Sequence, residues 1–327
     1  MNLSRRGLWH RDRPSRAKWL IVALIVGGLV IPSLWLAWPV LGDPSAGFAQ
    51  RRGNIETVDV TRRWQADNSD YRHLTLRASS GLQVEVTVRR PQNVDEPRPL
   101  VILLGGYGTG REAAELVRDP GGVVIASLSY PYHGKTHFAG LDLLWNLDDI
   151  QQAVLDTPPA IMLTLEYLAR QSYVDTRQIE LVGVSFGAFF VSVPGALDER
   201  FSRVWLIQGA ADPRAIYQYR LRDRIRFEPL RTLAASVLGF ITATDYLKPE
   251  RWVGNISPRP VVVINSRGDT AYPPASVAKL HASLREPYEL QWLTGEHITP
   301  GREEVLQQLN EQVIKRIAVH NDSKSEN

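Results

Sequence analysis

The chain has 327 residues, of which 44% are apolar and 22% charged, the composition of an ordinary globular protein. Its formal net charge of +3 comes from residues 1–18, which hold six basic side chains against Asp12, so the remainder is slightly acidic and gives no sign of nucleic-acid binding. The absence of cysteine excludes a disulfide framework and a thiolate metal site.

The first predicted element is a membrane-spanning helix. Residues 19–41 carry no charge and are rich in Leu, Ile, Val and Ala. At 1.5 Å per residue such a helix extends about 34 Å, enough for the hydrocarbon core of a bilayer. The basic flank predicts that residues 1–18 form a cytoplasmic tail, that 19–41 are a signal anchor of the bacterial inner membrane, and that the rest is periplasmic. A signal peptide cleaved near Gly47-Phe48-Ala49 is the alternative.

The next segments predict a linker and an antiparallel sheet edge. Residues 42–54 contain Gly, Pro and Ser, which is typical of a linker. Alternating apolar and polar residues then indicate antiparallel strands at Ile55–Trp64, Tyr71–Ser79 and Leu82–Pro91. We expect the folded domain to span residues 55–320, and residues 321–327 to be a disordered tail.

After Pro97, short and continuously apolar runs alternate with helix-like stretches. The runs are Leu100–Leu104, Val123–Leu128, Ile179–Val184, Val204–Ile207, Val261–Ile264 and Leu290–Leu293. The stretches are Arg111–Arg118, Asp148–Arg170, Phe186–Leu197, Pro274–Leu284 and Glu303–Ile317. Strands that are apolar throughout are typical of a parallel sheet covered on both faces. The predicted fold class is therefore α/β, with a mostly parallel, doubly wound sheet and antiparallel N-terminal edge strands.

Residues 213–258 interrupt this alternation. The segment is too long for an ordinary connection between a helix and a strand. It mixes aromatic and aliphatic residues with seven arginines. We expect a mostly helical, cap-like insertion over the carboxyl edge of the sheet; surface decoration without a role in binding is the alternative.

The candidate nucleophile is Ser185. It lies in Gly183-Val184-Ser185-Phe186-Gly187, which follows an apolar strand and precedes a helix. In this context a Gly-x-Ser-x-Gly sequence forms a strained turn that lifts the serine Oγ clear of the sheet and points a helix N-terminus at it. The Gly-x-Ser-x-Gly pattern arises by chance in about one chain in ten of this composition, but seldom at the end of a central strand.

A serine nucleophile needs a general base and a group that orients the base. Asp269 and His297 each follow a predicted strand, so both belong at the carboxyl edge of the sheet where ligand sites form. Asp212, after the preceding strand, is the rival to Asp269. His133 and His137 are spaced like metal ligands, but Gly134 makes a helix there improbable and no carboxylate accompanies them. We expect neither a metal nor a cofactor.

Hydrolysis of an acyl bond also requires preplaced donors for the oxyanion. The loop Gly105-Gly106-Tyr107-Gly108-Thr109-Gly110 follows the first predicted parallel strand, and its glycines allow close approach of the backbone. We expect the N–H groups of Tyr107 and Phe186 to form the oxyanion hole, with Gly105, Gly106 and Gly108 shaping the loop. A phosphate-binding loop is less consistent, because the Lys-Ser/Thr ending is missing; a plain mobile loop remains open.

These motifs, in the order Ser185, Asp269, His297, resemble the α/β-hydrolase superfamily across roughly residues 55–318. The turn Tyr130-Pro131-Tyr132-His133-Gly134 also looks like the loop after the family's fourth strand. Within the superfamily the chain is most similar to dienelactone-hydrolase-like and prolyl-oligopeptidase-like enzymes. Many members have His where this chain has Gly105, a departure that concerns how the loop is anchored. The resemblance implies an α/β-hydrolase fold and hydrolysis of an acyl bond.

The leading functional hypothesis is a serine esterase that cleaves carboxylic esters of small molecules. A serine peptidase or amidase, a thioesterase or acyltransferase, and a non-catalytic envelope binding protein are the alternatives. We expect small-to-medium acyl esters as substrates. The aromatic residues of 213–258 are then expected to line the pocket, and its arginines to be available to an anionic group.

Overall fold

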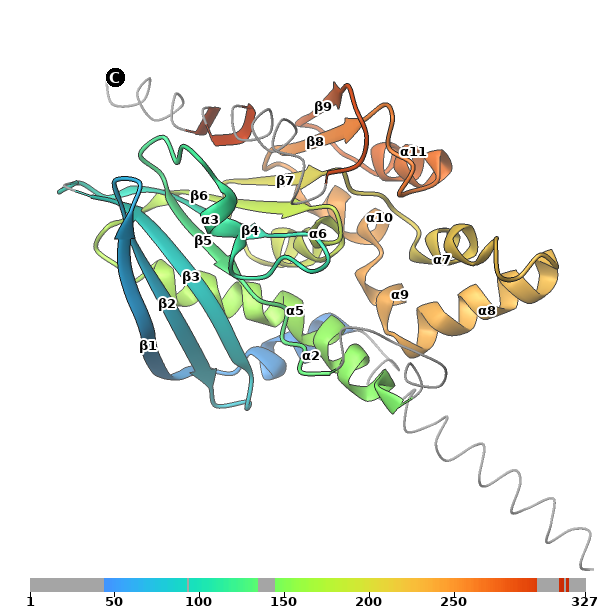
Figure 1. Ribbon diagram of the computed structural model, residues 1–327, viewed down its shortest axis with the longest axis horizontal. Helices are drawn as coiled ribbons and strands as arrows, with labels where there is room; N and C mark the ends of the chain where they lie inside the picture. The colour runs from blue at the N-terminus through green and yellow to red at the C-terminus, as the bar shows by residue number, and fades with distance from the viewer. Residues whose placement is uncertain (1–43, 93, 135–144, 299–311, 315, 318–327) are drawn as a thin grey trace, which may run out of the picture. The chain divides into compact units, whose positions relative to one another are not determined.

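A nine-stranded sheet organises the residues that the computed structural model describes, which are 44–92, 94–134, 145–298, 312–314 and 316–317 (Figure 1). Its strand order is β1-β2-β3-β5-β4-β6-β7-β8-β9. The strands are β1 (Ile55–Ala66), β2 (Ser69–Ala78), β3 (Gln83–Pro91), β4 (Arg98–Leu104), β5 (Val124–Leu128), β6 (Val174–Val184), β7 (Arg203–Ile207), β8 (Val261–Ser266) and β9 (Tyr288–Leu293).

The sheet changes from antiparallel to parallel at β5. The pairs β1–β2, β2–β3 and β3–β5 are antiparallel. The remaining pairs are all parallel: β5–β4, β4–β6, β6–β7, β7–β8 and β8–β9. Every residue of β5 and of β8 is buried, as expected of strands covered on both faces. The prediction of a mostly parallel sheet with antiparallel N-terminal strands is confirmed.

Helices cover the two faces of the sheet (Figure 1). One face packs against α5 (Leu147–Leu168) and α6 (Gly187–Leu197), with α11 (Pro274–Ala282) near the β8 edge. The other face packs against α3 (Ala113–Leu116), shorter than the predicted Arg111–Arg118, and against Val313, Ile314 and Ile317. Most of the predicted helix Glu303–Ile317 lies outside the described residues.

The segment between β7 and β8 is mostly helical. It contains α7 (Pro213–Leu221), α8 (Glu228–Ile241), α9 (Thr244–Leu247), α10 (Pro249–Trp252) and the 3₁₀ helix η2 (Val253–Ile256). Figure 1 shows these helices beside the carboxyl ends of the parallel strands, with α8 at the edge of the molecule.

The segment expected to be a linker, residues 42–54, is instead largely a helix. Helix α2 (Pro44–Arg52) packs on α5, and the Phe48 side chain is 1% exposed. Arg51 Nη1 forms an ion pair with Asp156 of α5 at 2.6 Å. The burial of one aromatic side chain outweighs the weak helix preference of the surrounding Gly, Pro and Ser.

The predicted span at residues 19–41 lies outside the described residues. Within the ranges that the structure describes, none of the helices combines the length and the apolar character needed to cross a bilayer.

Candidate active site

The candidate site lies where the sheet connections diverge. Neighbouring strands β4 and β6 lead in opposite directions, because the chain passes from β4 to β5 on one side and from β6 to β7 on the other. A crevice forms at the carboxyl ends of two such strands. Residues 105–110 follow β4 and Ser185 follows β6, so the predicted oxyanion loop and nucleophile meet there.

The turn at Ser185 depends on the two glycines of its motif. Ser185 has a φ of +54°, a left-handed conformation that a non-glycine residue adopts only under local constraint. A Cβ at Gly187 would lie 2.3 Å from the Leu104 carbonyl oxygen, and one at Gly183 would lie 2.5 Å from Val191 Cγ2. Any side chain at either position would push the turn away from β4 or from α6.

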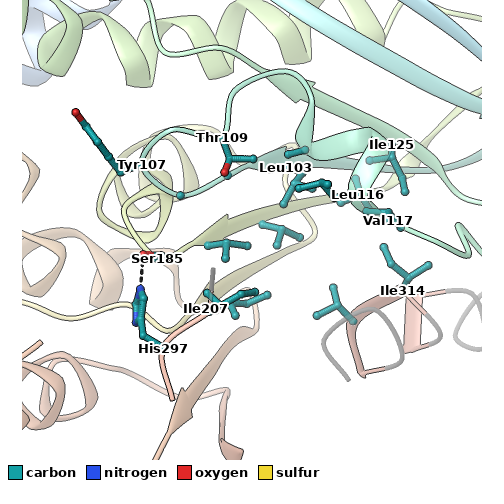
Figure 2. A pocket seen from close by; sticks show the side chains of 18 of the residues that line it. Leu103, Tyr107, Thr109, Leu116, Val117, Ile125, Ser185, Ile207, His297 and Ile314 are labelled. Carbon is teal, nitrogen blue, oxygen red and sulfur yellow. Dashed lines mark hydrogen bonds between the residues drawn. The ribbon is translucent and has the colours of Figure 1, made fainter. Parts of the chain in front are cut away.

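Three predicted side chains form one hydrogen-bonded series. Ser185 Oγ lies 2.6 Å from His297 Nε2, and His297 Nδ1 lies 2.7 Å from Asp269 Oδ2 (Figure 2 draws the first contact). The Asp269 side chain is 5% exposed and that of His297 is 18% exposed. With a carboxylate at Nδ1, Nε2 is left to accept the serine proton, which is the arrangement of a nucleophile, a general base and an orienting acid.

Asp212, the rival acid, is engaged elsewhere. It caps α7 by accepting a hydrogen bond from the Ala215 N–H at 3.2 Å, and its carboxylate pairs with Lys279 Nζ at 2.6 Å. Burial raises the pKa of Asp212. The hydrogen bonds to its carboxylate and the charge of Lys279 together lower the pKa by more than burial raises it, so the pKa lies below its usual value. Asp212 thus stabilises the start of the insertion, whereas Asp269 contacts the imidazole.

Sequence reasoning missed Gln208, which holds the main chain on both sides of His297. Its Nε2 donates to the Glu296 carbonyl at 3.4 Å and to Ser266 Oγ, and its Oε1 accepts from the Ile298 N–H. Gln208 is fully buried and has a φ of +48°. Its one sequence signal is a polar residue directly after the apolar strand β7.

The predicted oxyanion loop lies against the nucleophile. A Cβ at Gly106 would be 3.4 Å from Ser185 Cβ, which is van der Waals contact, so the loop lies directly beside the nucleophile. The Tyr130 hydroxyl donates to the Gly105 carbonyl at 2.6 Å, and burial raises the pKa of Tyr130 well above its usual value. Tyr130 therefore anchors the loop at Gly105.

The two residues expected to supply the oxyanion donors, Tyr107 and Phe186, contact each other through their rings. Phe186 is the N-cap of α6, so its N–H belongs to the unpaired set at a helix N-terminus. Its ring lies edge-on to that of Tyr107, with centroids 6.1 Å apart, which places both residues at the same opening. The N–H groups of Tyr107 and Phe186 remain the predicted donors.

Tyr272 also contacts the series. Its ring packs edge-on against the His297 imidazole, with centroids 5.4 Å apart. Burial raises the pKa of Tyr272 to about 12, although a hydrogen bond with the Ser185 side chain acts in the opposite direction. Tyr272 therefore keeps its proton at neutral pH.

Comparison with known proteins gives a likeness in structure alone. The sequence matches no protein-family model and no curated protein. Acetyl xylan esterase 1 from Thermoanaerobacterium sp. is 16% identical, with a TM-score of 0.57 over 83% of this chain and 93% of its own. An acetyl xylan esterase from Paenibacillus sp. R4 is also 16% identical, with a TM-score of 0.59 over 83% of this chain and 92% of its own. A hypothetical protein from Pseudomonas aeruginosa is 14% identical, with a TM-score of 0.56 over 82% of this chain and 99% of its own.

The chain has the α/β-hydrolase fold. Each of these similarities covers at least nine-tenths of the solved chain, and at such low identity it establishes the fold rather than the activity. Strand β1 pairs with β2 at the outer edge of the sheet.

Beside Ser185 the α/β-hydrolase fold encloses a cavity of about 320 Å³ (Figure 2). Its floor is the sheet face formed by β4, β5, β6 and β7, and α3 and the segment that holds Val313 and Ile314 form its walls. The described lining is mainly aliphatic: Val101, Leu103, Leu116, Val117, Ile125, Val182, Val184, Ile207, Ile298, Val313 and Ile314. Ser185 and His297 lie at one end, so an apolar group in the cavity would be adjacent to both.

The insertion contributes differently from expectation. Among the described lining residues, Arg220 is the one that comes from 213–258, so the predicted aromatic lining by this segment is wrong. Phe227 and Phe240 are 68% and 38% exposed instead. The strands of the α/β-hydrolase fold supply the lining because their alternate side chains already form an apolar face beside the nucleophile.

Metal binding has no support in the described residues. No three His, Asp or Glu side chains gather there in a way that could hold an ion. His133 is described, but His137 lies outside the described residues.

Proposed function

We propose that the protein is a serine esterase that hydrolyses carboxylic esters through an acyl-enzyme at Ser185. The observation that carries this proposal is the 2.6 Å contact between Ser185 Oγ and His297 Nε2 at the opening of an apolar cavity. Acetyl xylan esterases are among the proteins of similar fold, which agrees with ester chemistry.

In the first half of the reaction, Ser185 Oγ attacks the ester carbonyl carbon while its proton passes to His297 Nε2. Asp269, 2.7 Å from Nδ1, fixes the tautomer and stabilises the imidazolium. The carbonyl oxygen becomes an oxyanion, which the N–H groups of Phe186 and Tyr107 stabilise. When the tetrahedral intermediate collapses, the alcohol leaves with the proton from His297.

In the second half, water takes the place of the alcohol. His297 removes a proton from water, the resulting hydroxide attacks the acyl carbon, and the Ser185 oxygen leaves with the proton. Burial raises the pKa of the Tyr272 hydroxyl to about 12, so this group keeps its proton and takes no part in the proton transfer.

An activity-based probe tests this proposal. A fluorophosphonate reacts only with an activated serine, so the wild-type protein should be labelled and Ser185→Ala should not. Ser192→Ala is the matched control, because Ser192 lies in the adjacent helix α6, buried and bonded to the Phe189 carbonyl. Equal labelling of wild type and Ser185→Ala would contradict the proposal.

The cavity supports small-to-medium acyl groups as substrates. Its volume of about 320 Å³ is at the lower end of small-molecule sites. Arg220 carries the one permanent positive charge among the described lining residues, and it is available to an anionic group. With p-nitrophenyl esters of increasing length, kcat/KM should rise and then fall. Arg220→Gln should lower kcat/KM for a succinyl ester more than for a butyryl ester; equal losses would exclude the charge preference.

We further propose that residues 19–41 anchor the protein in the bacterial inner membrane, with residues after 42 on the periplasmic side. The uncharged run and its basic flank support this orientation. A reporter enzyme that is active only outside the cytoplasm, fused after Asn327, should be active. A fusion that is produced at full length but has an inactive reporter would overturn this orientation.

A further inference from the structure

Helix α8 places its small residues inward and its large apolar residues outward. Ala235 is fully buried, and a Cβ at Gly239 would lie 3.0 Å from Asp245 Oδ1, so this side packs tightly against α7 and α9. The large residues recur at helical spacing on the opposite side, with Phe227 just before the helix. We call these residues the outer face of α8: Phe227 (68% exposed), Leu230 (52%), Leu233 (61%), Val237 (46%) and Phe240 (38%).

This orientation is the reverse of an ordinary surface helix. An amphipathic helix of a soluble protein turns its large apolar side chains toward the core. The outer face of α8 instead leaves a continuous apolar stripe in solvent, and such stripes mark surfaces that bind a partner or a membrane. Figure 1 shows α7 and α9 between α8 and the sheet.

The surroundings of the outer face are strongly basic. Residues 213–241 hold six arginines but only two acidic residues, Asp223 and Glu228, in a chain whose other residues after 18 are net acidic. Arg224 and Arg226 are exposed just before α8, and neither has an ion-pair partner among the described residues. Large apolar side chains beside unpaired arginines are the composition of a helix that lies in the interface of an anionic bilayer.

Chain length also favours a bilayer as the partner. The predicted span ends at Leu41 and α2 begins at Pro44, and three residues of chain can cover at most about 10 Å. Helix α2 is held to α5 through Arg51 and Asp156, and Gln151 Nε2 of the same helix donates to the Ile241 carbonyl at the end of α8. Residues 151 and 156 are about 7.5 Å apart along α5. Helix α2 and the end of α8 are therefore both held to α5.

We propose that the outer face of α8 inserts into the headgroup region of an anionic phospholipid bilayer. The apolar side chains reach the upper part of the acyl layer, and Arg224 and Arg226 pair with lipid phosphates. This contact gives the domain a second attachment and a fixed orientation on the membrane. The proposal rests on the predicted anchor and not on the esterase reaction.

Site-specific fluorescence tests the proposal directly, because the natural chain has no cysteine. Full-length Leu233→Cys is labelled with a polarity-sensitive fluorophore and reconstituted into phosphatidylglycerol–phosphatidylethanolamine vesicles that contain a lipid nitroxide at a shallow acyl position. We expect a blue-shifted emission and at least twofold quenching. Arg63→Cys, exposed on the edge strand β1, is the control and should remain unshifted and unquenched.

Two further arms separate the possible occupants. Phosphatidylcholine vesicles, and the added pair Arg224→Glu and Arg226→Glu, should each reduce quenching at position 233, and equal quenching in all cases would overturn the assignment to anionic lipid. A blue shift without quenching would show that protein covers the face, through a second copy or closure over the cavity, and would overturn the proposal. A probe at position 233 that stays water-exposed would also overturn it. Hydrolysis of a soluble ester by the same samples reports separately on the proposed function.

Discussion

Replacement of Gln208 by methionine is the sharpest test of how the candidate base is held. Methionine preserves the length and approximate volume of the side chain but removes both the amide donor and the amide acceptor. The Glu296 carbonyl, the Ile298 N–H and Ser266 Oγ would each lose one hydrogen-bond partner. His297 lies between the first two, so its loop would be held mainly by the Gly268 N–H bond to the Gly295 carbonyl at 3.0 Å.

The expected magnitude follows from these lost contacts. An unsatisfied buried polar group destabilises a fold by about 1–3 kcal/mol, and partial relaxation of the loop gives a total of about 2–4 kcal/mol for Gln208→Met. A displacement of His297 by about 1 Å would lower kcat by up to about 100-fold, while KM changes little because Gln208 is buried behind the loop. We therefore expect a 10- to 100-fold lower kcat toward p-nitrophenyl acetate.

The matched control is Asn265→Leu. Asn265 is 1% exposed at the end of the neighbouring strand β8, and it bonds to the Gly209 carbonyl and to His281 without touching the His297 loop. Urea unfolding should show a similar loss of stability in both variants, whereas steady-state kinetics should show a loss of kcat in Gln208→Met alone. Equal effects on kcat, or a destabilised Gln208→Met with normal kcat, would refute the positioning role.

Gln208→Glu supplies a second readout of the same role. A protonated glutamic acid can donate to Ser266 and accept from the Ile298 N–H, as glutamine does, and burial raises the pKa of a carboxyl group. Activity relative to wild type should therefore fall as the pH rises, because ionisation removes the donor and leaves a buried charge. A pH-independent ratio would contradict this explanation.

The remaining predictions concern the acid, the oxyanion loop and the cavity. Asp269→Asn should lower kcat about 10⁴-fold, because the His297 tautomer is lost, whereas Asp212→Asn should reduce thermal stability with little effect on kcat; the reverse ranking, measured with one ester, would move the acid to Asp212. Tyr130→Phe removes the anchor of the Gly105 carbonyl and should lower kcat about 10-fold with KM unchanged, and an unaltered kcat would show that the anchor is dispensable. Leu103→Trp should fill the cavity and shift the optimum of a p-nitrophenyl ester panel to shorter acyl chains, so an unchanged optimum would place the acyl group elsewhere.

The sheet and the series of Ser185, Asp269 and His297 were accessible from the sequence for a common physical reason. Buried parallel strands must be apolar throughout, so the last residue of each apolar run marks the carboxyl end of a strand. A reactive side chain directly after such a run therefore lies at the edge of the sheet where sites form. Each of these inferences requires only local sequence. The Gly-x-Ser-x-Gly pattern can also be recognised in the local sequence, although the close contact of Gly187 with Leu104 of β4 is a long-range one.

The features that escaped prediction depend on partners distant in the sequence. Gln208 acts on residues 88 to 90 positions away, and the Tyr130 anchor spans 25 positions. Helix α2 was mistaken for a linker because its stability comes from Phe48 and Arg51 packing on α5, which local propensity cannot reveal. The cavity lining was assigned to the aromatic insertion because nothing in the sequence shows which face of β4 or β6 borders empty space.

The contact of Gly187 with the Leu104 and Gly105 carbonyls has a consequence for redesign. Backbone touching backbone sets the separation between nucleophile and oxyanion loop, whereas the acyl cavity is bounded by side chains that project from the strands. Backbone contacts of the turn and the loop therefore determine reactivity, whereas strand side chains determine which acyl groups are accepted. A library that varies only Leu103, Ile125 and Val182 would change which acyl groups fit the cavity, while the distance between the nucleophile and the oxyanion loop stays constant.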